Sequence, residues 1–169
     1  HGDDIILKRM KRRHLARDII RFCDEARRRR PDVVFGADVI AGFPTETDQA
    51  HQASLDMMVA ADITHLHVFP YSPRVGTPAA QMPQLAPEII KARSRALRLL
   101  GAQRLKEFLD SKVGTKDQLL VEMDNRGHGR NFTKIRLDGE ICPSGRLVNV
   151  DIVQRDGNSL VGRVGVRGI

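Results

Sequence analysis

The sequence has only two cysteines, Cys23 and Cys142, and neither belongs to a C-x-x-C pattern. Two isolated thiols cannot supply the ligands of a zinc site or an iron–sulfur cluster, and they suit a reducing cytoplasm. No apolar run approaches the length of a membrane-spanning helix, so we expect no membrane partner. The chain begins with His1 rather than Met, on a loop-like His-Gly-Asp-Asp stretch. We therefore expect a piece of a longer protein.

The 169 residues carry a net charge of +7, and the charge is unevenly distributed. Residues 1–30 hold 11 Lys/Arg against 5 Asp/Glu, whereas residues 31–82 hold a single cation, Arg74, against 6 acids. Basic ends around an acidic middle indicate a polyanionic partner. For the arginine run 27–30 at a helix end we favour simple solvation. For the denser run 8–14, nucleic-acid contact and solvation are equally compatible with the sequence.

The first two thirds of the sequence alternate between helical and strand patterns. A short helical turn over 5–10, capped by Asp3 or Asp4, precedes a helix over 14–29 whose apolar face includes Cys23. Strands are expected over 33–41 and 64–71, separated by a helix over 45–61 that Thr45 and Asp48 begin as an approximate capping box. This order predicts parallel βαβ units in an α/β fold. A proline-rich loop over 72–87 then leads to a long helix over 87–111.

Beyond residue 112 short alternating runs are separated by Gly, Asn and Asp turns such as DNRGHGRN, LDGE and RDGNS. The runs DQLLVEM, NFTKIRL, RLVNVDIV and SLVGRVGV predict a small antiparallel β-barrel. The expected domains are therefore an α/β domain over 1–111 and a barrel over 112–169. Two strands are too few for a closed (β/α)₈ barrel. The first domain is either a small open sheet or the tail of a larger barrel, and the abrupt start at His1 favours the tail.

Candidate ligand-binding residues lie where the parallel strands end, because ligands bind at that edge of such sheets. Gly42, Phe43 and Pro44 follow the first strand, and Arg74 follows the second. The alternative for Arg74 is a pairing with Asp38 or Glu46. Asp38 is either an inward-pointing barrel residue or a paired structural acid. His65 and His67 share one strand face, but with no third ligand we favour packing over metal binding.

In the second domain, the stretch GRNFTKIRL places an aromatic side chain among cations at period two. Bases stack on aromatic rings and phosphates contact cations, so this strand face is a candidate platform for single-stranded nucleic acid. The alternative is that the aromatic ring packs inward, which would set the cations against the core. The platform residues are Arg130, Phe132, Lys134 and Arg136.

Four motifs in order resemble those of one family. The start HGDDIILKRMKRRH, then DVIAGFPTETD, HVFPYSPRVGTPAA and GHGRNFTKIRL…GRLVNVDIV resemble the second half of the radical-SAM methylthiotransferases and their TRAM domain. The resemblance covers about residues 1–164. It is strongest to the branch that methylthiolates N6-threonylcarbamoyladenosine in tRNA. The isopentenyl-adenosine and ribosomal-protein aspartate branches remain open.

The resemblance implies the C-terminal portion of a radical-SAM (β/α) barrel followed by an OB-like TRAM barrel. The parent enzyme would use S-adenosylmethionine and two [4Fe–4S] clusters to add a methylthio group at C2 of a modified adenosine next to the anticodon. This chain lacks the cluster cysteines, so we expect it to be inactive alone and to bind no cluster. Family members have glycine where Thr45 stands, which leaves the closest backbone approach at that turn in question.

The site residues that follow from the resemblance fall into two sets. S-adenosylmethionine would contact a partial cleft, and tRNA would contact the TRAM barrel and the basic run after the first helical turn. A stand-alone RNA-binding module without catalysis is the alternative from another class. Oligomeric state is left open. The cofactor-binding set is Gly2, Asp3, Asp38, Gly42, Phe43, Pro44 and Arg74, and the RNA-binding set is Lys11, Arg12, Arg13, Arg130, Phe132, Lys134 and Arg136.

Overall fold

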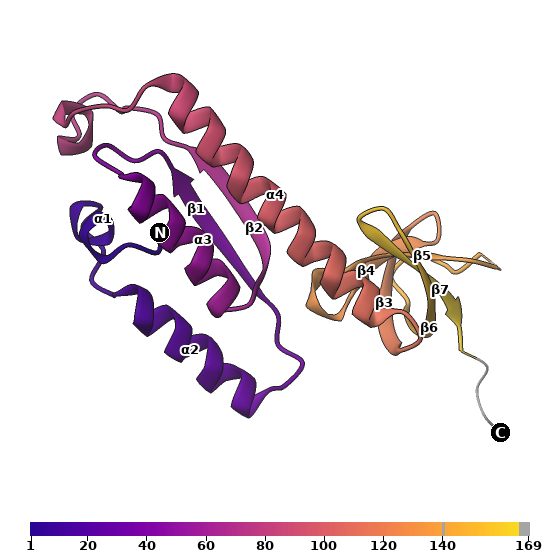
Figure 1. Cartoon of the computed structure of the whole chain (residues 1–169). Helices are drawn as coiled ribbons and strands as arrows, with labels where there is room; N and C mark the ends of the chain where they lie inside the picture. The colour runs from indigo at the N-terminus through magenta and orange to yellow at the C-terminus, as the bar shows by residue number, and fades with distance from the viewer. Residues whose placement is uncertain (140, 166–169) are drawn as a thin grey trace. The chain divides into compact units, whose positions relative to one another are not determined.

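The computed structural model describes residues 1–139 and 141–165, and these divide into two units, His1–Arg104 and Leu105–Ile169. We call them the first unit and the barrel unit (Figure 1). The division falls inside the longest helix, whereas the sequence placed the boundary between residues 111 and 112. Glu140 of the predicted LDGE turn, Val166 of the last predicted strand and the end of the predicted domain 112–169 lie outside the described residues.

The first unit begins with two helices, α1 (Asp4–Arg9) and α2 (Ala16–Arg29). Asp3 caps α1 as predicted, because its Oδ1 accepts the Ile6 N–H at 2.9 Å. The arginines at the end of α2 are mostly exposed and pair locally with acids, as the solvation interpretation predicts. Arg27 differs, because its guanidinium donates to the carbonyls of Ala61 and Asp62.

Two parallel strands, β1 (Phe35–Ala41) and β2 (Ile63–Pro70), form the sheet of this unit, with α3 (Asp48–Ala60) between them. The parallel βαβ prediction is therefore confirmed. The predicted start of α3 was wrong, since Thr47 rather than Thr45 is the N-cap and its Oγ1 accepts the Ala50 N–H. Thr45 instead has a φ of 67°, which is outside the conformations that a cap residue adopts.

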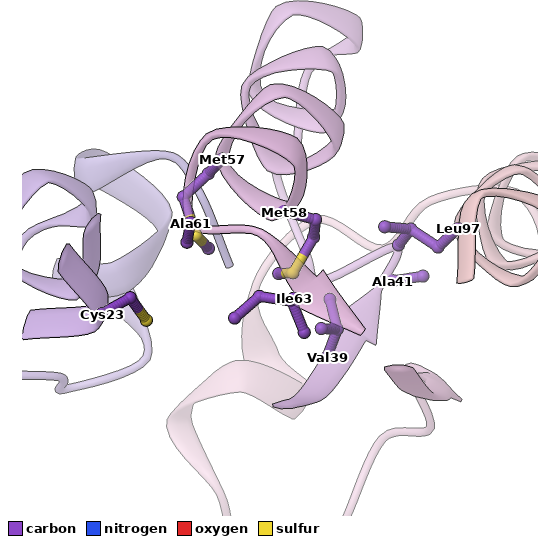
Figure 2. Packing of buried hydrophobic residues seen from close by; sticks show 8 residues of the cluster. All are labelled: Cys23, Val39, Ala41, Met57, Met58, Ala61, Ile63 and Leu97. Carbon is purple, nitrogen blue, oxygen red and sulfur yellow. The ribbon is translucent and has the colours of Figure 1, made fainter. Parts of the chain in front are cut away.

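One face of the two-stranded sheet is covered by helices (Figure 2). Met57 and Met58 from α3, Leu97 from α4 (Pro87–Lys112) and Cys23 from α2 pack around strand residues. Cys23 is 2% exposed, so the prediction of a buried thiol is confirmed, and burial raises its pKa. The opposite face carries the alternate strand residues, whose register partners are Gly36 with His65, Asp38 with His67 and Ile40 with Phe69.

A short 3₁₀ turn, η1 (Pro78–Gln81), lies in the loop between β2 and α4. Among the residues that the structure describes, no helix is both long and apolar enough to span a bilayer.

The barrel unit is a closed sheet in the order β3-β4-β5-β7-β6. Its strands are β3 (Lys116–Met123), β4 (Arg126–Gly129), β5 (Lys134–Leu137), β6 (Leu147–Asp156) and β7 (Ser159–Val164), with a 3₁₀ turn η2 (Arg130–Phe132) before β5. A small closed barrel was predicted correctly. The prediction that it is wholly antiparallel was wrong, because β7 lies parallel to β5.

Strand β4 was also not predicted, since its Gly-rich sequence was assigned to a turn. The turn itself is shorter: Asp124 and Asn125 both have positive φ and join β3 to β4 as a two-residue hairpin. Gly127 is required within β4, because a Cβ there would lie 1.8 Å from the Leu120 carbonyl oxygen. Inward residues of the barrel strands, with Leu109 from the end of α4, form its core.

Candidate functional site

The turn after β1 is organised by a buried carboxylate, Glu46, which is 2% exposed. Its Oε2 accepts the Gly42 N–H at 2.6 Å and the Arg93 guanidinium at 3.1 Å. Its Oε1 lies 3.2 Å from His1 Nε2 and 3.7 Å from His51 Nδ1. One side chain thus joins the chain start, the strand end, α3 and α4.

The neighbours of this carboxylate fix its charge state. Burial raises the pKa of Glu46, but the hydrogen bond from His1 and the charge of Arg93 more than offset that effect, and the net pKa is lowered. His1 Nδ1 accepts the Asp3 N–H at 3.0 Å, so the imidazole proton belongs on Nε2, where it can be donated to Glu46. For His51, burial lowers the pKa, and the nearby Arg93 acts in the same direction.

Sequence reasoning missed both Glu46 and Arg93 as site residues. A usable signal was present for Arg93, which lies at helical spacing from the apolar residues Ile90 and Leu97 of α4. A charge on the buried side of a helix needs a partner, and charged side chains are seldom fully buried otherwise. The partner, however, is 47 residues away in sequence.

The three cofactor-binding residues predicted at this turn, Gly42, Phe43 and Pro44, are all buried in the first unit. Gly42 has a φ of 76°, and its Cα lies against Ile90, where a Cβ would come within 2.7 Å. Phe43 and Pro44 are buried, and the Phe43 ring meets Tyr71 edge to face at 5.4 Å. The turn therefore presents a closely packed rim rather than free side chains.

The remaining residues of that set are dispersed. Gly2 donates its N–H to Ser54 Oγ and packs against α3, while Asp3 caps α1. Arg74 is exposed in the loop after β2. The alternative pairing of Arg74 with Glu46 is not found, because Arg93 occupies that carboxylate.

Asp38 is exposed and lines a pocket of about 250 Å³ in the first unit. Arg12, from the predicted RNA-binding set, lines the same pocket, as do His1 and His14. The structure thus brings together two residues that the sequence assigned to different ligands. Lys11 and Arg13, the neighbours of Arg12, are exposed after α1.

The described residues do not fit an iron–sulfur cluster. Cys23 is buried in the first unit and Cys142 belongs to the barrel unit. Within residues 1–139 and 141–165, no group of three or more His, Cys, Asp or Glu side chains is placed to hold a metal ion. His65 and His67 are therefore not joined by a third described ligand.

The outer surface of the barrel gathers a second set of predicted residues. Lys134 and Arg136 on β5 line a depression of about 410 Å³, together with Arg126 and His128 on the neighbouring strand β4. Glu122 and Asp156 line it as well, so acids flank the cations. The strand pairing places His128 opposite Lys134 and Arg126 opposite Arg136.

The predicted period-two face over residues 130–136 was wrong in part. Arg130 and Phe132 do not belong to β5, because the chain forms η2 there and Asn131 has a φ of 61°. The alternative with the aromatic ring inward is also excluded, since Phe132 is 82% exposed. Its ring centroid lies 5.4 Å from that of His128. Phe132 therefore reaches the cationic surface from a loop rather than from the strand.

The fold and these surfaces define the class: an α/β unit joined to a closed five-stranded barrel of the OB-like kind, with cations and an exposed aromatic ring on the barrel surface. A comparison with models of known protein families finds no match. A comparison with curated proteins does find related sequences. The chain is 50% identical to threonylcarbamoyladenosine tRNA methylthiotransferase MtaB of Rickettsia prowazekii over 152 aligned residues. These residues make up 90% of this chain and 36% of that protein.

Two further relatives are tRNA-2-methylthio-N(6)-dimethylallyladenosine synthases. The protein of Magnetococcus marinus is 37% identical over 96% of the chain, and that of Paracoccus denitrificans is 35% identical over 95%. The chain spans between 36% and 39% of the length of these three relatives. This chain is homologous to a part of the tRNA methylthiotransferases.

Proposed function

We propose that this chain is the C-terminal portion of a tRNA methylthiotransferase that acts on N6-threonylcarbamoyladenosine next to the anticodon. The observation that carries the proposal is the 50% identity to the Rickettsia prowazekii protein over 90% of the chain. Identity of that extent covers both units, so it favours a methylthiotransferase over a stand-alone RNA-binding module. The two dimethylallyladenosine synthases are less similar, at 37% and 35% identity.

In this proposal the first unit supplies the last strands of a radical-SAM barrel, and residues 112–169 form a TRAM domain. S-adenosylmethionine would be bound beside the rim at Gly42–Pro44 and the pocket that Asp38 lines, within the cytoplasm. The cluster ligands would lie in parts of the parent enzyme outside this chain, since Cys23 and Cys142 belong to different units. All three relatives are named for tRNA, which favours a tRNA substrate over the ribosomal-protein aspartate of the third branch.

The enzymatic part of the proposal is tested in the organism that carries the gene. Deletion of the gene should remove the 2-methylthio group from threonylcarbamoyladenosine, measured by mass spectrometry of digested tRNA. Loss of the group from dimethylallyladenosine instead would assign the protein to the other branch. Unchanged nucleosides of both kinds would refute the tRNA reaction.

The barrel unit would bind tRNA through the cations that line its surface depression. Lys134 lies there without an ion pair among the described residues, and Arg136 is 3.9 Å from Asp156. Replacing both with glutamine should weaken binding of the 169-residue chain to tRNA. It should also make the decrease of log K with log salt shallower, by about 0.7–0.9 in slope for each phosphate that is no longer neutralised.

Arg163 offers a matched control on the same barrel, because Asp138 already accepts two hydrogen bonds from its guanidinium. Arg163→Gln should leave the salt slope unchanged. An effect of Arg163→Gln about half as large as that of the double change, which removes two charges, would mean that net charge alone governs binding and that the depression has no particular role.

A further inference from the structure

The loop between β4 and β5 holds an aromatic residue in an unfavourable backbone conformation. Asn131 and Phe132 have φ values of 61° and 60°, in the left-handed region. Asparagine tolerates that region, whereas a bulky residue such as phenylalanine is an outlier there. Strain of this kind persists where the surrounding structure enforces it, and it concentrates at functional sites.

A buried carboxylate contacts the start of this loop. Asp117 on β3 is 8% exposed, and its Oδ1 accepts the Arg130 N–H at 3.3 Å and the N–H of Gln118 at 2.7 Å. The Gly129 N–H donates to the Thr133 carbonyl and closes the loop at its base. A side chain at Gly129 would come within 2.6 Å of Ile135 Cδ1 and 3.1 Å of Asp117 Oδ2, so glycine leaves room for both of these side chains. The loop is thus fixed from inside the barrel.

The fixed loop presents the Phe132 ring to solvent beside a cationic surface. The ring is 82% exposed, and His128 supports it on one side at 5.4 Å between centroids, tilted by 48°. That separation leaves no room for a third ring between the two, so a planar ligand would have to stack on the free face of Phe132. Arg130 donates to Gln118 Oε1 at the base of the same loop.

We propose that this loop captures one unpaired base of the RNA on Phe132, and that Asp117 is the positioning residue that holds the ring in place. The inference rests on the proposed RNA-binding function of the barrel and specifies its substrate as RNA with an unstacked nucleotide. Bases in a duplex are stacked on their neighbours and offer no free face, whereas loop and single-stranded bases do. The nearby cations would hold the adjacent phosphates.

The test compares two RNAs of equal length, a hairpin with an open loop and a blunt duplex, bound to the 169-residue chain. Phe132→Ala should weaken hairpin binding by roughly 5- to 150-fold, the range for loss of one base–aromatic stack, and change duplex binding less than about twofold. Phe132→Tyr retains the ring and should bind both RNAs like the parent chain. If Phe132→Ala leaves hairpin affinity unchanged, the ring serves another partner and the inference is wrong.

The role of Asp117 is tested by a double-mutant cycle. Asp117→Ala should weaken hairpin binding, and Asp117→Asn should restore it, because the amide oxygen can still accept the Arg130 N–H. On the Phe132→Ala background, Asp117→Ala should have no further effect on hairpin affinity, since it acts through the ring. Additive losses in the cycle would refute the positioning role. Circular dichroism of each variant shows whether the barrel remains folded, and Asp117→Leu, which is close in size to Asp117→Asn but has no acceptor, carries the test if Asp117→Ala does not fold.

Failure of this inference can be told apart from failure of RNA binding itself. If Lys134 and Arg136 prove to govern binding while Phe132 and Asp117 do not, the barrel binds RNA without capturing a base. If the chain binds neither RNA, both the tRNA-binding role of the barrel and the present inference are overturned.

Discussion

Replacing Arg93 with methionine should destabilise the first unit by about 3–5 kcal/mol, the usual effect of removing one partner from a buried ion pair. The change deletes two hydrogen bonds to Glu46, from the guanidinium to Oε2 at 3.1 Å and to the backbone carbonyl at 2.8 Å. The carboxylate would then be buried without its cation. The third bond, to Asp48, adds little because that side chain is fully exposed.

The assay can be restricted to the first unit. The chain contains one tyrosine and no tryptophan, and Tyr71 lies in that unit against Phe43. Tyrosine fluorescence during urea unfolding therefore reports on the first unit alone. At a typical denaturant dependence of about 1–3 kcal/mol per molar urea, the midpoint should fall by at least about 1 M.

A second variant separates charge burial from packing. The double variant Glu46→Gln with Arg93→Met should be more stable than Arg93→Met alone by at least about 1 kcal/mol, because no uncompensated charge remains buried. Arg95→Met is the matched control, since Arg95 is exposed on the same helix, and it should change stability by less than about 0.5 kcal/mol. A loss below about 1 kcal/mol for Arg93→Met would refute the argument.

Two other predictions concern pH and packing. The lowered pKa of His51 means that the folded state favours its neutral form, so stability should fall as the pH drops below the ordinary histidine value toward the lower folded-state pKa. His51→Gln should flatten that part of the tyrosine-monitored profile, and an unchanged slope would exclude His51 as its source. Gly127→Ala should destabilise the barrel by more than about 1 kcal/mol, because the new Cβ meets the Leu120 carbonyl. Far-UV circular dichroism should show that loss while the Tyr71 transition stays in place, and a shift of the tyrosine transition instead would contradict the assignment of Gly127 to a separate unit.

Most of the helices and strands were predictable because their signals are local. The long helix over Pro87–Lys112 follows from its proline start and apolar spacing, and β1 follows from its apolar run. The sequence-based prediction was wrong where one local sequence pattern was compatible with two helix starts. Both Thr45 and Thr47 can begin a helix, and the left-handed backbone at Thr45 decides the outcome. That conformation accompanies the tight turn that Glu46 holds at Gly42.

The site was less predictable because its partners are far apart in sequence. The alternation of residues 130–136 suggested a strand face, but Asp117 lies 13 residues before Arg130 and holds that segment in a turn. Phe132 is exposed, as the predicted platform requires, but it lies in the turn before β5 and not on a strand face. In the same way, a sequence alone does not show which of several acids meets Arg93.

The parallel pairing of β5 with β7 bears on how the protein is synthesised. Strand β7 lies between β5 and β6 in the sheet, so the ring of strands stays open until residues 159–164 are available. While a ribosome still holds this segment, β5 and β6 each expose an unpaired edge that can pair with another chain. The first unit has no such requirement, because its strands lie between residues 35 and 70. We therefore expect the barrel to be the last part of the described chain to fold during translation.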